Sequence, residues 1–150
     1  MQPSDRSAQI SALYQEMILD HYRRPRNKGA IENATHTILM KNPLCGDEIE
    51  VQIRYDGDSI ADIGFSGRGC SISQASASMM TQMIKGKSIA EIDELRTQFR
   101  NMVMGADADE NSLGSLRALS GVARFPARVK CALLAWNALE EAQKNRQQGS

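Results

Sequence analysis

The amino-acid sequence predicts an α+β domain in which a three-stranded antiparallel sheet packs against several helices. The segment from Glu48 to Tyr55 alternates apolar and polar residues, which is the period of a half-buried strand. Asp56-Gly57-Asp58 then supplies a hairpin turn, and a second alternating stretch follows it. Before and after these strands, apolar residues recur at the helical spacing of three to four. This order of a helix, then strands, then helices predicts a two-layer domain.

The first half of the chain contains one predicted helix and three predicted strands. The helix runs from about Ser7 to Arg23, and Pro25 ends it because the residue before a proline avoids the helical region. The first strand lies near Thr37 to Lys41, and the second is the alternating segment described above. The apolar residues expected to face inward from the helix and from the return strand are Ile10, Leu13, Met17, Ile18, Ala61, Ile63 and Phe65.

The apolar period changes to that of a helix after the return strand. A helix is predicted from about Ile72 to a glycine stop at Gly86. The segment Ser88-Ile89-Ala90-Glu91 matches a capping box and opens a further helix that continues to about Met102.

Residues 105 to 122 are predicted to form mostly loop, because glycine, aspartate and asparagine are frequent there; a short helix at Leu116 to Leu119 is possible. The last helix starts at Pro126 and runs to about Gln143. Its predicted core stripe consists of Phe125, Val129, Leu133 and Trp136. Cys131 lies more than a third of a turn from that stripe and is therefore expected away from the core.

Length and charge restrict the classes of function. The chain has 150 residues, which fits one domain over 1–150, with tails expected to fray over 1–6 and 145–150. Eighteen basic and eighteen acidic residues cancel, which argues against nucleic-acid binding. Neither a membrane span nor a signal peptide is evident. An odd count of three cysteines argues against a disulfide framework and for the cytoplasm.

Three cysteines and one aspartate form the pattern most indicative of function. Cys45 and Asp47 flank Gly46 on a predicted tight turn between strands, where glycine lets both side chains face one point. Cys70 lies at a strand-to-helix junction, where free backbone N–H groups favour a thiolate. Cys131 follows Arg124 and Arg128 on the last helix. Together Cys45, Asp47, Cys70 and Cys131 offer the four ligands of a tetrahedral Zn²⁺ site.

Other interpretations of these residues are weaker. Each cysteine taken singly is more often an inert buried thiol. The glycines before Cys70 do not form a dinucleotide fingerprint, because Ile72 stands at the third glycine position. His21 is interpreted as a surface or capping histidine at the end of the first helix rather than as a metal ligand.

Four segments in this order resemble the SufU/IscU/NifU-N family of iron–sulfur cluster assembly proteins, and specifically its SufU type. The resemblance extends from Leu13 to about Glu141. The matching segments are Leu19-Asp20-His21-Tyr22-Arg23-Arg24-Pro25-Arg26-Asn27, Asn42-Pro43-Leu44-Cys45-Gly46-Asp47, Gly67-Arg68-Gly69-Cys70-Ser71-Ile72-Ser73 and Phe125-Pro126-Ala127-Arg128-Val129-Lys130-Cys131-Ala132-Leu133-Leu134-Ala135-Trp136.

The resemblance implies a three-stranded antiparallel sheet and a zinc-dependent sulfurtransferase that accepts persulfide sulfur from a SufS-type cysteine desulfurase. It implies that Zn²⁺ is bound by Cys45, Asp47, Cys70 and Cys131, with Cys45 as the sulfur acceptor. A histidine of the desulfurase would replace Cys45 on the metal, and Arg128 could steady the released thiolate. A SufBCD-type scaffold is the expected downstream partner.

Two departures separate the chain from the IscU type, which has a Leu-Pro-Pro-Val-Lys motif and a histidine before the third cysteine. Here the corresponding segment is Phe125-Pro126-Ala127-Arg128-Val129, and Lys130 precedes Cys131. Two alternatives stay open: a scaffold that assembles an iron–sulfur cluster on the same four residues, and a structural zinc domain that acts only as a binding module.

Overall fold

The structure is a computed structural model that describes residues 3–44 and 46–148. Its helices and strands are, in chain order, α1 (Pro3–Arg23), β1 (His36–Asn42), β2 (Asp47–Asp56), β3 (Ser59–Arg68), α2 (Ser71–Ile84), α3 (Ile89–Val103), the 3₁₀ helix η1 (Glu110–Arg124) and α4 (Pro126–Gln147). The predicted α+β class is confirmed. Within the described residues, no helix combines the length and apolar character needed to span a bilayer.

The three strands form one antiparallel sheet in the order β1-β2-β3. Asn42 at the end of β1 pairs with Asp47 at the start of β2, and Glu48 pairs with Arg68 at the end of β3. These three strand ends therefore lie at the same end of the sheet. Along β2 the side chains alternate as predicted, with Ile49, Val51 and Ile53 fully buried.

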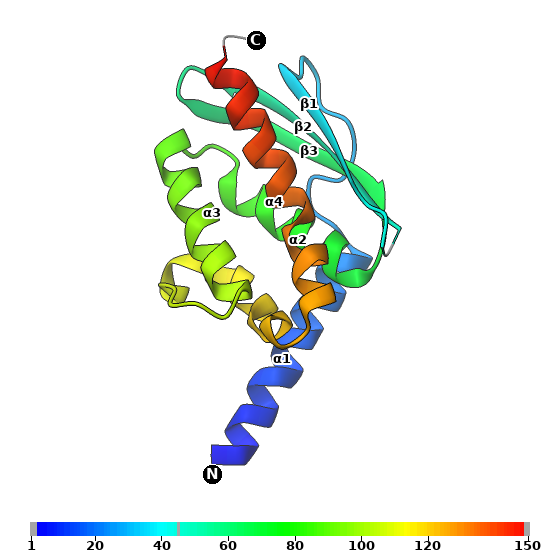
Figure 1. Cartoon of the computed structure of the whole chain (residues 1–150), viewed down its shortest axis with the longest axis vertical. Helices are drawn as coiled ribbons and strands as arrows, with labels where there is room; N and C mark the ends of the chain where they lie inside the picture. The colour runs from blue at the N-terminus through cyan, green and yellow to red at the C-terminus, as the bar shows by residue number, and fades with distance from the viewer. Residues whose placement is uncertain (1–2, 45, 149–150) are drawn as a thin grey trace.

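Helices cover the face of the sheet to which those apolar side chains point. The long helix α4 crosses the sheet (Figure 1) and packs against β1 and β2, while α2 packs against β3 and α4. On the far side of α4, Phe99 of α3 stacks on Trp136, with ring centroids 4.7 Å apart. The core is thus continuous from the sheet through α4 to α3.

The prediction of mostly loop over 105–122 was correct only for residues 105–109. The possible short helix at Leu116 to Leu119 is confirmed but is part of a longer one: residues Glu110–Arg124 form η1, with Gly114 in a non-helical conformation inside it. The buried apolar side chains Leu113, Leu116, Leu119 and Val122 recur at every third residue. After the kink at Gly114, this spacing matches the three residues per turn of a 3₁₀ helix, so Leu116, Leu119 and Val122 lie on one apolar face.

Cys131, predicted to lie off the core stripe of the last helix, is nevertheless buried, and the predicted stripe itself was partly wrong. Cys131 is 2% exposed, whereas Phe125, assigned to the core stripe, is 60% exposed. The reason is that α4 packs against β1, β2, α2, α3 and η1, and is buried on several sides rather than along one stripe. Phe125 precedes the first turn of α4 and lies at the edge of this packing.

The first helix is longer and less buried than predicted. Helix α1 begins at Pro3, and its N-terminal half extends away from the rest of the molecule (Figure 1), so Ile10 and Leu13 are 44% and 58% exposed. Met17 and Ile18 pack against the core as expected. His21, interpreted from the sequence as a surface or capping histidine, is buried instead. Its Nδ1 lies 2.8 Å from Ser78 Oγ of α2.

Candidate metal centre

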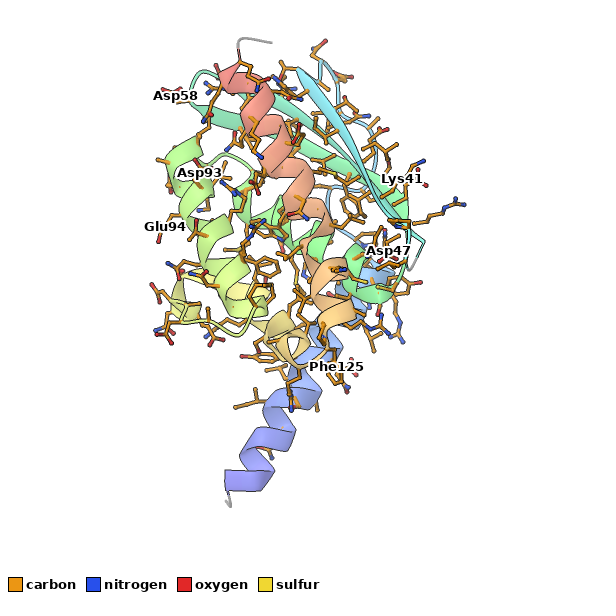
Figure 2. All side chains as sticks on the ribbon, viewed as in Figure 1. Lys41, Asp47, Asp58, Asp93, Glu94 and Phe125 are labelled. Atoms are coloured by element: carbon orange, nitrogen blue, oxygen red, sulfur yellow. The ribbon has the colours of Figure 1, made fainter. Side chains whose placement is uncertain are left out.

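Three of the four predicted ligands come together at one end of the sheet. Asp47 is the first residue of β2, Cys70 lies between β3 and α2, and Cys131 is in the second turn of α4. One donor atom from each residue lies within 4.8 Å of the other two. Figure 2 shows Asp47 at this end of the sheet, beside the start of α2. The hairpin register and the α2–α4 packing thus unite residues that are far apart in sequence.

Asp47 and Cys70 are held to each other by a hydrogen bond. The Cys70 backbone N–H donates to Asp47 Oδ1 at 2.9 Å, and the Cys70 Sγ lies 3.7 Å from the second carboxylate oxygen, Oδ2. Asp47 is 2% exposed. The carboxylate is therefore held through Oδ1, with Oδ2 facing the Cys70 thiol.

Gly69 makes this close approach possible. Its φ is +153°, a backbone conformation that residues with a side chain rarely adopt. A Cβ at this position would overlap the Asp47 carboxylate and would lie 2.7 Å from Ser73 Oγ. Ser73 is itself buried, and its hydroxyl donates to the Cys70 carbonyl at 3.1 Å. The glycine before the second cysteine therefore leaves room for the carboxylate.

The donor set fits zinc. Neither Cys70 nor Cys131 is in a disulfide, and a thiolate and a carboxylate are ligands that Zn²⁺ takes in proteins. Ligand bonds of the usual length would place neighbouring donor atoms about 3.5–3.8 Å apart in a tetrahedral site. The three donor atoms, within 4.8 Å of one another, need only a small contraction to reach that spacing.

Cys45 lies outside the described residues, but both of its neighbours are tied to Asn42. The Leu44 N–H donates to Asn42 Oδ1 at 3.2 Å, and the Gly46 N–H donates to the Asn42 carbonyl at 2.9 Å. Asn42 is 8% exposed and pairs with Asp47 across the hairpin. The residues on each side of Cys45 are therefore fixed next to Asp47.

Basic side chains surround the site. Lys41 and Arg68 lie 3.7 and 3.6 Å from the carboxylate oxygens of Glu48, the residue that follows Asp47. Arg128 and Lys130 are exposed in the first turns of α4. Three thiolates and a carboxylate would leave a zinc-filled site with net negative charge, which these cations offset.

Arg128 lines a groove of about 570 Å³ beside the site. The groove lies between α1, η1 and the first turns of α2 and α4, and it includes Ser71 and Ile72, which directly follow Cys70. Phe125, at the base of the extended half of α1 in Figure 2, is on its rim. The described part of the groove contains the cations Arg124 and Arg128 and no acidic residue.

Three polar residues near the site were not predicted from the sequence: Ser73 and Asn42, which bond to residues at the site, and Ser76, which bonds to α4. Ser73 and Ser76 are fully buried. A signal was present in the serines at positions 71, 73, 76 and 78 of a helix otherwise predicted to be apolar. Buried serines on a helix indicate hydrogen bonds to neighbouring elements, because an unpaired buried hydroxyl is costly.

The fold and this site define a class of protein: a small α+β domain that brings cysteines and an aspartate to one end of its sheet. The family model described as "NifU-like N terminal domain" matches residues 13–145, and the chain belongs to that family.

Two relatives and one solved structure are closely similar. The chain is 48% identical to the zinc-dependent sulfurtransferase SufU of Bacillus subtilis, covering 90% of this chain and 92% of that protein. It is 43% identical to the iron–sulfur cluster assembly scaffold protein IscU of Streptococcus pyogenes, covering 91% and 86%. A putative scaffold protein for the SUF system from Fervidobacterium islandicum has a TM-score of 0.81 at 42% identity, covering 85% and 93%.

Proposed function

We propose that this protein is a zinc-dependent sulfurtransferase that accepts persulfide sulfur from a SufS-type cysteine desulfurase for iron–sulfur cluster assembly. The observation that carries the proposal is the convergence of Asp47, Cys70 and Cys131 in a chain 48% identical to a zinc-dependent sulfurtransferase. Cys45 is the fourth zinc ligand and the sulfur acceptor. The reaction takes place in the cytoplasm, and a SufBCD-type scaffold receives the sulfur.

Cys45 acts as the nucleophile. Bound zinc keeps its cysteine ligands deprotonated at neutral pH, and a thiolate rather than a thiol attacks sulfur. The Cys45 thiolate attacks the terminal sulfur of the desulfurase persulfide and forms a new S–S bond. The S–S bond of the desulfurase breaks, and its cysteine leaves as a thiolate, so the transfer needs no external oxidant or reductant.

Arg128 stabilises negative charge during the transfer. Its exposure in the first turn of α4 and its place in the groove that also includes Ser71 and Ile72 support this role. The desulfurase occupies that groove, where the apolar rim and the two arginines offer a mixed apolar and basic contact surface.

Turnover of the desulfurase tests this function. Its rate is measured with substoichiometric amounts of the zinc-loaded protein, the zinc-free protein and the Cys45→Ala variant. We expect strong stimulation by the zinc-loaded protein alone. Stimulation by Cys45→Ala equal to that of the unaltered protein would exclude Cys45 as the acceptor, and no stimulation by any form would contradict the sulfurtransferase.

A scaffold that assembles an iron–sulfur cluster on the same residues is the second candidate, favoured by the similarity to IscU of Streptococcus pyogenes. Anaerobic incubation with iron, cysteine and desulfurase distinguishes the two functions. A scaffold would gain a cluster chromophore, pass the cluster to an apo-protein and be inhibited by added zinc.

A further inference from the structure

Two hydrogen bonds that share the Ser76 hydroxyl join α2 to α4 near the metal centre. The Ser76 hydroxyl of α2 donates to the Ala132 carbonyl of α4 at 2.6 Å. The indole Nε1–H of Trp136, one turn further along α4, donates to Ser76 Oγ at 3.2 Å. Ser76 and Ala132 are fully buried and Trp136 is 2% exposed. The serine hydroxyl therefore has both a donor and an acceptor partner, away from water.

This contact lies where it sets the separation of two ligands. Ala132 directly follows Cys131, and Ser76 is six residues after Cys70, about 9 Å along the axis of α2. Cys70 is fixed to Asp47 by its own backbone N–H. The position of the Cys131 thiol, in contrast, depends on how α4 sits against α2.

Ala135 and Ala138 of α4 are buried, but burial of such apolar side chains fixes no particular offset between two helices, because hydrophobic contact is non-directional. A hydrogen bond between buried partners is directional and costly to leave unmade. The Ser76 hydroxyl therefore fixes the offset between the two helices.

We propose that Ser76, supported by the Trp136 indole, is a positioning residue that holds Cys131 at zinc-binding distance from Cys70 and Asp47. The inference rests on the zinc site of the proposed function but does not require sulfur transfer. Residues that orient metal ligands without touching the metal typically contribute tenfold to a hundredfold to metal affinity.

The test compares Ser76→Ala with Ser78→Ala. Ser78 is an equally buried serine of the same helix, but its hydroxyl contacts His21 of α1 rather than α4. For both variants the zinc dissociation constant is measured by competition with a chelator, and the visible absorption bands of the Co²⁺-substituted protein are recorded. Circular dichroism and thermal unfolding of the zinc-free proteins report on the fold.

We expect Ser76→Ala to weaken zinc binding by about tenfold or more and to alter the Co²⁺ bands. Ser78→Ala should lower thermal stability yet leave both metal readouts unchanged. Trp136→Phe keeps an aromatic ring against Phe99 but removes the N–H together with the five-membered ring of the indole, so its loss of thermal stability is measured beside its zinc affinity. It should weaken zinc binding less than Ser76→Ala does, and it carries the test if Ser76→Ala does not fold. Unchanged zinc affinity and Co²⁺ bands in Ser76→Ala, or equal losses in Ser78→Ala, would overturn the proposal.

Discussion

Gly69 provides the most direct test of the metal centre at the scale of single residues. In Gly69→Ala the new Cβ would overlap the Asp47 carboxylate, so the carboxylate has to leave the Cys70 N–H. We expect zinc affinity to fall by about tenfold to a hundredfold, the usual cost of disturbing the support of a metal ligand. Competition with a chelator measures the change.

Gly86→Ala is the matched control. Gly86 also has a positive φ, +83°, but a Cβ there meets nothing within 4 Å. Each substitution strains the backbone, by about 1–3 kcal/mol for a side chain in such a region. Only Gly69→Ala should weaken zinc binding, and equal zinc affinities in the two variants would contradict the close approach described for Asp47.

The residues of the metal centre could be predicted from sequence where local chemistry defined them. Asp47 and Cys70 were predicted next to glycines at turns, and both lie at such positions. Cys131 was expected away from the core, whereas it is buried. Ser76 was not predicted, because its role depends on which face of α4 lies against α2, and that is decided by packing between elements far apart in sequence.

At the scale of secondary structure, His21 couples the docking of α1 on α2 to pH. Its ring lies against Ser78, and burial, followed by the charge of Arg26, lowers the pKa of His21 below its ordinary value. In the unfolded chain the pKa of histidine is about 6.5. Below that pH the unfolded state binds more protons, so stability should fall as the pH decreases from 7.5 to 5.5.

Urea unfolding at these two pH values, in parallel for the unaltered protein and His21→Gln, measures this effect. Both proteins share the same metal ligands, so the difference between their pH dependences belongs to His21. The variant should lose less stability than the unaltered protein on acidification. Parallel curves would show that His21 does not link α1 docking to protonation.

The helices and strands that were predicted correctly are those whose apolar residues recur with the period of an α-helix or a strand. The strand at Asp47–Asp56 and the capping box at Ser88 were confirmed, because a period of two and a reciprocal cap are local signals. Most of helix η1 was missed because its period of three matches neither an α-helix nor a strand. The exposed half of α1 has a helical apolar pattern but extends beyond the core, and sequence alone does not show where a core ends.

At the scale of the whole molecule, the metal centre lies at one end of a large apolar core. Fully buried side chains from the sheet, α2, α3, η1 and α4 form one cluster, which includes Phe65, Phe99 and Trp136. Structural zinc domains that unfold without metal usually lack such a core. A catalytic or exchangeable zinc is compatible with a fold that persists after the metal is removed.

We therefore expect the zinc-free protein to stay folded. After chelation, far-ultraviolet circular dichroism should keep its helical signal and urea unfolding should stay cooperative, at a lower midpoint than with zinc.

Because zinc binds the folded state in preference to the unfolded chain, free zinc at a hundred times its dissociation constant would add about 2.7 kcal/mol to the free energy of unfolding. Cys131→Ser, which lacks one ligand, should gain less from the same zinc concentration. Loss of the cooperative transition on chelation would instead identify a structural zinc domain, because the ion would then supply folding energy that the core does not.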